Sequence, residues 1–257
     1  MDVAQGIATV TLNRPQQHNA LTRELRIKLA IAVESLQADE DVAVIIFTGS
    51  GDRAFSAGVD LKEFETAPMT PDEVGIDSRL MLAFAALRKP TIAAINGYAL
   101  TGGFELALNC DILVASRNAS FGDTHVRVGV PPGWGLSQNL AQLIGPMRAR
   151  YLSFTGNFLD AETAKEWGLV LEVVEPDQLL PYCRKMAQDI RSCDQATLCD
   201  YRDAIREGLK KGVVAGLALE SRLSKAALAR FDAAYFGKTR NTVMNLGQGQ
   251  KAGNDSD

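Results

Sequence analysis

Two glycine-rich stretches contain residues of this sequence that could carry out chemistry. In "AFSAGVDLKEF" (54–64), the small residues Ala57 and Gly58 precede a helix predicted to start near Asp60. Small side chains let a ligand approach the backbone, and free N–H groups before a helix favour an anionic oxygen. By itself, this pattern is more typical of a tight loop with an aspartate cap.

The second stretch, "NGYALTGGFELALNCD" (96–111), places Glu105 among apolar neighbours in the first turn of a predicted helix. Such a carboxyl group should have a raised pKa, which suits a residue that transfers protons. With Gly102 as the N-cap, however, Glu105 is the third helical residue, where glutamate commonly stabilises a helix end. The two interpretations are about equally supported.

Together the two stretches predict an oxyanion hole. Two strand-to-helix junctions can each direct one backbone N–H at the same carbonyl oxygen, and losing one such donor costs other enzymes about 10²–10³ in rate. Glu105 would then move protons at carbons next to that carbonyl. The predicted chemistry is that of an enolate or a tetrahedral intermediate.

A third stretch, "GDTHVRVGVPPGW" (122–134), contains His125, one of only two histidines. An imidazole, with an ordinary pKa of about 6.5, exchanges protons near neutral pH. Asp123 is a second candidate acid or base. Alternatively, His125 only fills space and is hydrogen-bonded to Asp123 or a carbonyl. No metal is expected, because His18 lies in a different motif and metal-ligand spacing is lacking.

The secondary structure predicted to position these residues differs between the first and the last part of the chain. Residues 1–175 alternate apolar strands with amphipathic helices, and Thr22 is the predicted N-cap of a helix over 21–39. Residues 50–75 are predicted to form a long, partly mobile surface segment. From 176 onward three helical periods follow without a strand, which predicts an α/β core at 1–175 and a helical region at 176–244. The polar residues 245–257 are predicted to be disordered.

Composition and charge limit which partners and which location we expect for the protein. A net charge of −4 gives no long-range attraction to nucleic acid or to an anionic membrane. The sequence shows neither an apolar run of about 18 residues nor a secretory signal, and "NDSD" is not a peroxisomal address. We therefore expect a cytoplasmic protein with no nucleic acid or membrane partner. Its four scattered cysteines are predicted to be reduced and buried.

Five stretches in this order and spacing resemble the enoyl-CoA hydratase/isomerase family, the crotonases: "NRPQQHNAL", "AFSAGVDL", "NGYALTGGFELALNCDILVAS", "FGDTHVRVGVPPGWGLSQNL" and "DAETAKEWGLVLEVV". The resemblance covers about 5–175. It implies an α/β fold, with a crotonase-like spiral of ββα turns and a helical C-terminal trimerisation region. It also implies an acyl-CoA thioester substrate, no separate cofactor because coenzyme A is part of the substrate, and a homotrimer or a dimer of trimers.

The resemblance also implies roles for individual residues. The backbone N–H groups of Val59 and Gly102 would form the oxyanion hole. Glu105 matches the first of two glutamates that add water in the hydratases, whereas the second is replaced by His125. The substrate-binding positions would be Ala57, Gly58, Asp60 and Leu61 in the coenzyme A loop, with Gly133 beside the water and Trp134 reshaping the acyl pocket. For the last two, a plain turn and a core aromatic are equally good interpretations.

Three functions follow from these residues. The first is an enoyl-CoA hydratase, a lyase of fatty acid metabolism, in which Glu105 activates or positions water and His125 is its partner. The second keeps the oxyanion hole for isomerisation, decarboxylation or thioester hydrolysis. The third is an acyl-CoA-binding protein without turnover. Glu105 argues against this function, because a protein that only binds needs no carboxylate beside an oxyanion hole. Lys62, Arg88 and Lys89 are weaker candidates for contacts with coenzyme A phosphates, since lone surface bases are usually only solvated.

Overall fold

The protein is described by a computed structural model that covers residues 1–233, 236–237 and 239–240. The chain divides into two compact units, residues 1–202 and residues 203–257. The predicted disordered stretch 245–257 lies outside the described residues.

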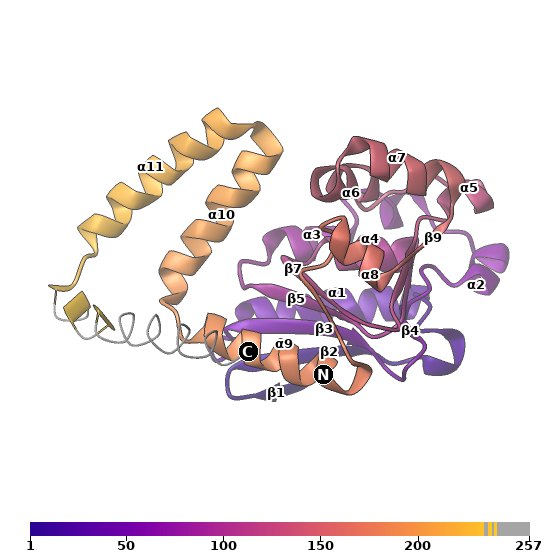
Figure 1. Ribbon diagram of the computed structural model, residues 1–257, viewed down its shortest axis with the longest axis horizontal. Helices are drawn as coiled ribbons and strands as arrows, with labels where there is room; N and C mark the ends of the chain where they lie inside the picture. The colour runs from indigo at the N-terminus through magenta and orange to yellow at the C-terminus, as the bar shows by residue number, and fades with distance from the viewer. Residues whose placement is uncertain (234–235, 238, 241–257) are drawn as a thin grey trace. The chain divides into compact units, whose positions relative to one another are not determined.

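A six-stranded sheet forms the centre of the first unit (Figure 1). β2 pairs with β3, β3 with β5, β5 with β7 and β7 with β10, all in parallel, and only β1 runs antiparallel to its neighbour. The strands are β1 (Asp2–Ala4), β2 (Ile7–Leu12), β3 (Val44–Gly49), β5 (Thr91–Ile95), β7 (Ile112–Ser116) and β10 (Glu172–Val174). The central strands β3 and β5 are mostly apolar and are buried along their whole length, because helices cover both faces.

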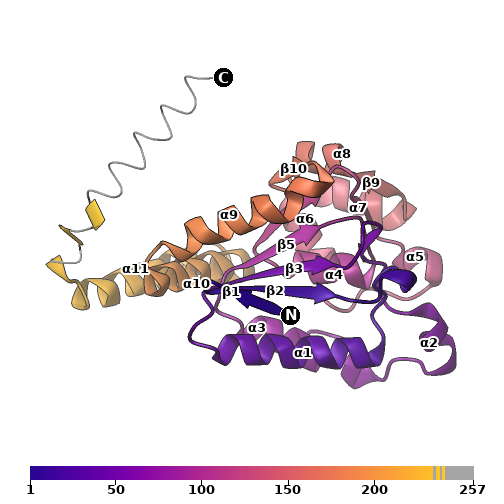
Figure 2. The same cartoon turned by 90° about the horizontal axis from the view of Figure 1, so that it is seen from below.

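Helices cover the two faces of this sheet as Figure 2 shows. α9 (Leu179–Arg191) packs on one face through Leu179, Cys183 and Ala187. α1 (Arg23–Ala38) and α3 (Arg79–Ala86) belong to the core on the other face. The Thr22 hydroxyl accepts a hydrogen bond from the Leu25 N–H and caps α1, which confirms the prediction.

A second, four-stranded sheet was not predicted. It has the order β4 (Ala54–Ser56), β6 (Tyr98–Leu100), β8 (Ser120–Gly122) and β9 (Phe158–Asp160), with β4, β6 and β8 parallel. Each strand pair β3–β4, β5–β6 and β7–β8 sends its first member to the large sheet and its second to the small one. This repetition is the predicted spiral of ββα turns.

The segment 50–75 is more ordered than predicted. It contains the buried strand β4, the helix α2 (Leu61–Thr66) and a 3₁₀ turn at Pro71–Glu73. The turn is tied to α1, because Arg23 and Arg26 both bond to Glu73. These hydrogen bonds, that from Arg23 foremost, hold the pKa of Glu73 at about 2. Long-range ion pairs of this kind leave no local pattern in the sequence.

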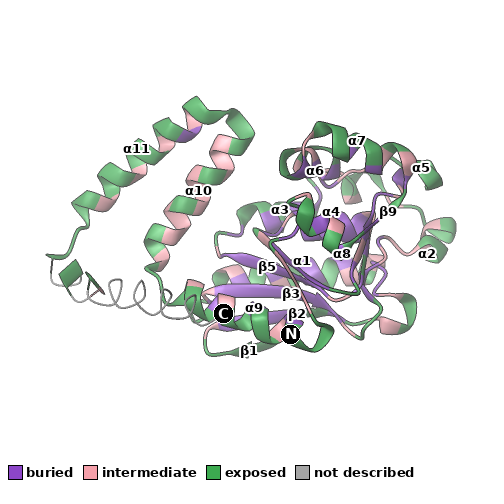
Figure 3. Cartoon of the chain, viewed as in Figure 1, coloured by how far each residue is buried: buried purple, intermediate pink, exposed green. Residues whose placement is uncertain are grey.

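The remaining helices include one short helix, α5, that was not predicted. They are α4 (Gly102–Leu108), α5 (His125–Val128), α6 (Leu136–Ile144), α7 (Pro146–Thr155), α8 (Ala161–Glu166), α10 (Gln195–Lys211) and α11 (Val213–Ala229). The predicted boundary at 175 marks the change from strand to helix, but the first compact unit extends to Arg202 and includes α9. Figure 3 shows the central strands β3 and β5 and the helix α4 as buried.

No disulfide joins the four cysteines, and only two of them are buried as predicted. Burial raises the pKa of Cys183 to about 12. Cys193 is exposed and Cys199 is half-buried, because both follow the part of α9 that packs on the sheet. Within the described residues, no helix combines the length and apolar content that crossing a membrane would require.

Candidate active site

The three stretches singled out in the sequence meet at one edge of the small sheet. β4 leads through Ala57 and Gly58 to α2, β6 leads through Thr101 to α4, and β8 leads through Asp123 to α5. Because these strands are neighbours and parallel, their carboxyl ends lie side by side. Ligand sites commonly form at such strand ends in α/β folds.

The two predicted oxyanion donors lie close together. A methyl group built on Gly102 would come within 3.6 Å of the Val59 nitrogen. Gly102 opens α4, so its N–H has no intrahelical acceptor. Leu21 bonds to the Gly58 carbonyl and to the Asp60 N–H, a pattern that turns the Val59 N–H away from Leu21.

Two glycines make this close approach possible. Gly58 has a φ of +89°, and a methyl group there would lie 2.1 Å from the Thr101 hydroxyl oxygen. A methyl group on Gly103 would lie 2.2 Å from the Ser56 carbonyl oxygen. Larger residues at either position would push the two junctions apart.

Thr101, not Gly102, is the N-cap of α4, which corrects the predicted helix start. Glu105 is therefore the fourth helical residue rather than the third. Thr101 has φ 44° and ψ −117°, a conformation in which a β-branched residue is strained. Its hydroxyl group donates a hydrogen bond to the Ala57 carbonyl at 3.4 Å and links the two junctions. The sequence placed Thr101 at this junction but gave it no role, because its only signal is its place before the Gly-Gly pair.

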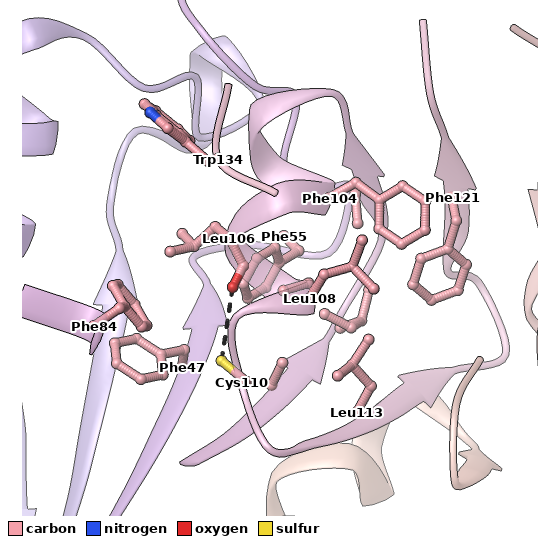
Figure 4. Packing of buried hydrophobic residues seen from close by; sticks show 14 of the residues in the cluster. Phe47, Phe55, Phe84, Phe104, Leu106, Leu108, Cys110, Leu113, Phe121 and Trp134 are labelled. Carbon is pink, nitrogen blue, oxygen red and sulfur yellow. Dashed lines mark hydrogen bonds between the residues drawn. The ribbon is translucent and has the colours of Figure 1, made fainter. Parts of the chain in front are cut away.

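Glu105 is almost fully buried, with 3% of the residue exposed. Its Oε1 accepts hydrogen bonds from the backbone N–H groups of Trp134 at 2.7 Å and Leu136 at 3.4 Å. Burial raises the pKa of Glu105, against the opposing effects of the Trp134 N–H and of His125. The predicted raised pKa is confirmed. The neighbours of Glu105 on α4, Phe104 and Leu106, pack in the hydrophobic core that Figure 4 shows.

His125 lies between two carboxylates. Its Nδ1 is 2.7 Å from Asp123 Oδ1, and its Nε2 is 3.6 Å from Glu105 Oε2. The second distance exceeds a direct hydrogen bond, but a single water can lie about 2.8 Å from both atoms. The structure therefore brings together all three titratable residues that the sequence singled out.

Asp123 is oriented by more than the imidazole. Its carboxylate also accepts the backbone N–H of His125 at 3.4 Å and a hydrogen bond from the Ser153 side chain. Burial alone would raise the pKa of Asp123, but the hydrogen bonds from His125 and Ser153 outweigh it and lower the pKa. Ser153 comes from α7, far from Asp123 in sequence, and was not foreseen.

Hydrogen bonds to residues outside the predicted substrate-binding loop hold this loop in place. The Ala57 N–H donates to the His18 carbonyl at 2.9 Å. The Asp60 side chain caps α2 and bonds to Arg14 at 2.8 Å, and this hydrogen bond lowers the pKa of Asp60. The carboxylate of Asp60 is thus committed to the fold, whereas the Leu61 side chain is exposed.

Trp134 lies beside the oxyanion donors. Its ring would be 3.3 Å from a methyl group on Gly102, and it also lines a cavity of about 70 Å³ with Arg26, Ser78 and Leu80. Trp134 is buried in the core, as the core-aromatic interpretation predicts. The same ring lies next to Gly102, as the pocket-shaping interpretation requires. Gly133 packs against the loop before α3, where a methyl group would lie 2.7 Å from Val74.

Other candidates lie away from this group. A larger surface pocket of about 570 Å³ includes Ala57 and His18 in its lining but neither Glu105 nor His125. Arg88 and Lys89 precede β5, at the end of the sheet opposite the site, and Lys89 bonds to the Leu36 and Asp39 carbonyls. Lys62 is exposed on α2. Only Lys62 remains near the predicted coenzyme A loop.

The arrangement can stabilise a negative oxygen and move a proton beside it. The backbone nitrogens of two junctions lie close together, a buried carboxyl group has one oxygen held by the backbone, and its other oxygen faces an imidazole. Such sites suit chemistry through an enolate or a tetrahedral intermediate.

Comparisons with known proteins identify the family of the chain. The enoyl-CoA hydratase/isomerase family model matches residues 2–237. A probable peroxisomal enoyl-CoA hydratase 1 of Arabidopsis thaliana is 42% identical over 94% of this chain and 91% of its own. A crotonyl-CoA hydratase of Syntrophomonas wolfei is 35% identical over 86% of each chain. The crystal structure of an enoyl-CoA hydratase from Mycobacterium tuberculosis superposes with a TM-score of 0.73 at 43% identity, over 88% of this chain and 96% of that one. The chain therefore belongs to the enoyl-CoA hydratase/isomerase family.

Proposed function

We propose that this protein adds water across the 2,3-double bond of a 2-enoyl-CoA, as an enzyme of the lyase type. Its relatives with most of their length in common are named as hydratases. The observation that carries the proposal is the 3.6 Å approach of Glu105 Oε2 to His125 Nε2, next to the junction formed by Gly102. Addition of water requires one proton to be taken from the water and one to be given to C2, and two proton-transferring groups lie close enough here to do both.

The proposed reaction begins with the thioester oxygen accepting the N–H groups of Val59 and Gly102. Water bonds to C3 while Glu105 takes its proton, and the electrons of the double bond form the enolate. The enolate carbon C2 then takes a proton from the protonated imidazole of His125. Return of the proton from Glu105 to His125, across the 3.6 Å gap, restores both groups.

Each group in this scheme has a physical reason for its role. Oε1 of Glu105 is held by backbone donors, which leaves Oε2 as the atom that exchanges protons. A raised pKa makes the carboxylate a stronger base than an exposed one. Backbone donors fixed by folding stabilise the enolate without having to reorganise.

The experiment is the steady-state hydration of crotonyl-CoA, followed by loss of enoyl absorbance. We compare the wild type with Glu105→Gln and His125→Ala, and use Thr22→Ala as a control on α1. General acid–base groups contribute about 10²–10⁴ in rate, so both site variants should lose at least about 10²-fold while the control stays unchanged.

Other outcomes select other functions. If only Glu105→Gln loses activity, His125 fills space and the enzyme works with one carboxylate. Binding of crotonyl-CoA without turnover by the wild type would refute hydration of this substrate. Product analysis on a wider acyl-CoA panel would then separate isomerisation, decarboxylation or thioester hydrolysis from binding alone.

The assembly and the location belong to the same proposal. A homotrimer or a dimer of trimers is expected from the family resemblance, and sedimentation equilibrium at several concentrations measures it. A cytoplasmic location is likewise a prediction, which imaging of the tagged full-length chain tests. Coenzyme A enters as part of the substrate, so dialysed protein should need no added cofactor for turnover.

A further inference from the structure

A buried hydrogen bond joins Asp123 to His125 on the side of the imidazole away from Glu105. Asp123 is 2% exposed and His125 is 9% exposed, so water competes little for this bond. The carboxylate is itself held by the backbone N–H of His125 and by Ser153. The orientation of the imidazole is therefore set by groups that folding has already fixed.

This geometry determines which ring nitrogen carries the proton. An ionised carboxylate has only acceptors, so the Nδ1 atom 2.7 Å from Asp123 must be the donor. In a neutral imidazole the other nitrogen, Nε2, then has a free lone pair. Nε2 is the atom that faces Glu105.

We propose that Asp123 is a positioning residue that holds His125 as the Nδ1–H tautomer, so that the imidazole exchanges protons only through Nε2, toward Glu105 and the substrate. Its effect on turnover rests on the proposed function, whereas its effect on the tautomer does not. Ser153 supports Asp123 by fixing the carboxylate. In this arrangement the single histidine acts from a defined atom, as a glutamate at the same position would act from its carboxyl oxygen.

The expected consequence is a loss in kcat with little change in KM. In Asp123→Asn, the amide can turn its NH₂ group toward Nδ1, which moves the ring proton to Nε2 and removes the free lone pair. Removal of groups that orient a functional histidine costs from about 10-fold to 10²-fold at metal sites to about 10⁴-fold in a serine protease triad. We expect kcat to fall by about 10²-fold and KM to change by less than about threefold.

Histidine-selective ¹⁵N NMR tests the tautomer directly, because the chain has only two histidines. His18→Asn leaves a single imidazole to observe. His18 has a φ of +50°, which asparagine tolerates, so this variant should fold. At a pH where the imidazole is neutral, His125 should show Nδ1–H in the wild type and in Ser153→Ala. Asp123→Asn should show Nε2–H or a mixture.

Each result bears on the proposal in one direction. An Nε2–H tautomer in the folded His18→Asn protein refutes it without any further variant. An unchanged Nδ1–H signal in folded Asp123→Asn also refutes it. If the tautomer is as expected but crotonyl-CoA is not hydrated, the positioning role stands and the proposed function fails. If hydration proceeds and Asp123→Asn keeps its kcat, the positioning role in turnover is wrong.

Discussion

Glu105→Gln should have opposite effects on rate and on stability. The introduced glutamine can keep its carbonyl oxygen where Oε1 lies, so that the N–H groups of Trp134 and Leu136 still find an acceptor. Its amide nitrogen then takes the place of Oε2, 3.6 Å from His125 Nε2. The shape of the site is preserved, while the exchangeable proton and the charge are lost.

The rate should fall by the contribution of one acid–base group. A loss of about 10²–10⁴ in kcat corresponds to about 3–5 kcal/mol of transition-state stabilisation. KM should change much less, because the substitution does not alter the backbone N–H groups of Val59 and Gly102, which we propose as the oxyanion donors.

The free energy of unfolding should rise at neutral pH. Burial raises the pKa of Glu105 in the folded state, so the charged form is less favourable there than in the unfolded chain. An incompletely paired buried charge costs about 1–3 kcal/mol, and each 1 kcal/mol changes Tm by roughly 2–4 °C in a protein of about this size.

The sign of the pH dependence follows from the same pKa. Between the ordinary pKa of glutamate and the raised one, the folded state binds more protons than the unfolded state, so the wild type loses stability as pH rises. Glu105→Gln lacks this loss, and its advantage should therefore grow from below pH 4.5 upward and then level off.

Urea unfolding of both proteins across this pH range, with crotonyl-CoA kinetics on the same samples, tests the reasoning. A variant that is less stable than the wild type at neutral pH would show that the carboxylate is stabilised in the fold and that its pKa is not raised. A variant that keeps full kcat would remove Glu105 from the chemistry.

Three further substitutions test the positions around the site. Gly58→Ala places a methyl group 2.1 Å from the Thr101 hydroxyl at a φ of +89°, and should lower kcat/KM more than about tenfold and stability by more than about 1 kcal/mol, as kinetics and urea unfolding would show. Trp134→Leu removes the ring that lies next to Gly102 and lines the 70 Å³ cavity. The ratio of kcat/KM for octenoyl-CoA to that for crotonyl-CoA should therefore rise about tenfold. An unchanged ratio in folded protein would exclude Trp134 as a limit on the length of the acyl chain. Thr22→Ala removes the cap of α1 and should cost about 1 kcal/mol in urea unfolding at unchanged kcat, whereas a change in kcat would show that α1 is coupled to the site.

Sequence patterns alone were sufficient where the physical cause is local. The buried strand at Val44–Gly49 is a run of β-branched and aromatic residues, and α1 repeats its apolar residues at helical spacing behind a threonine cap. The raised pKa of Glu105 could be foreseen from its apolar neighbours in the same helix. The motifs and their spacing by themselves also indicate the family.

The assembly of the site depends on contacts between elements that are far apart in the sequence. The strands β6 and β8 have three residues each, too few to show a periodicity, and they exist because they pair with each other and with β4. That pairing brings Gly58, Gly102 and His125 together from separate parts of the chain. The N-cap at Thr101 and the bond from Ser153 to Asp123 depend on the same contacts.

The sequence thus gives the residue types that are present, whereas folding determines which of their atoms face each other. A histidine in place of a glutamate is visible in the chain, but its role depends on which nitrogen meets which carboxylate. The distances of 2.7 Å to Asp123 Oδ1 and 3.6 Å to Glu105 Oε2 show which nitrogen faces which carboxylate. Such distances arise from packing between elements far apart in sequence, where no local pattern records them.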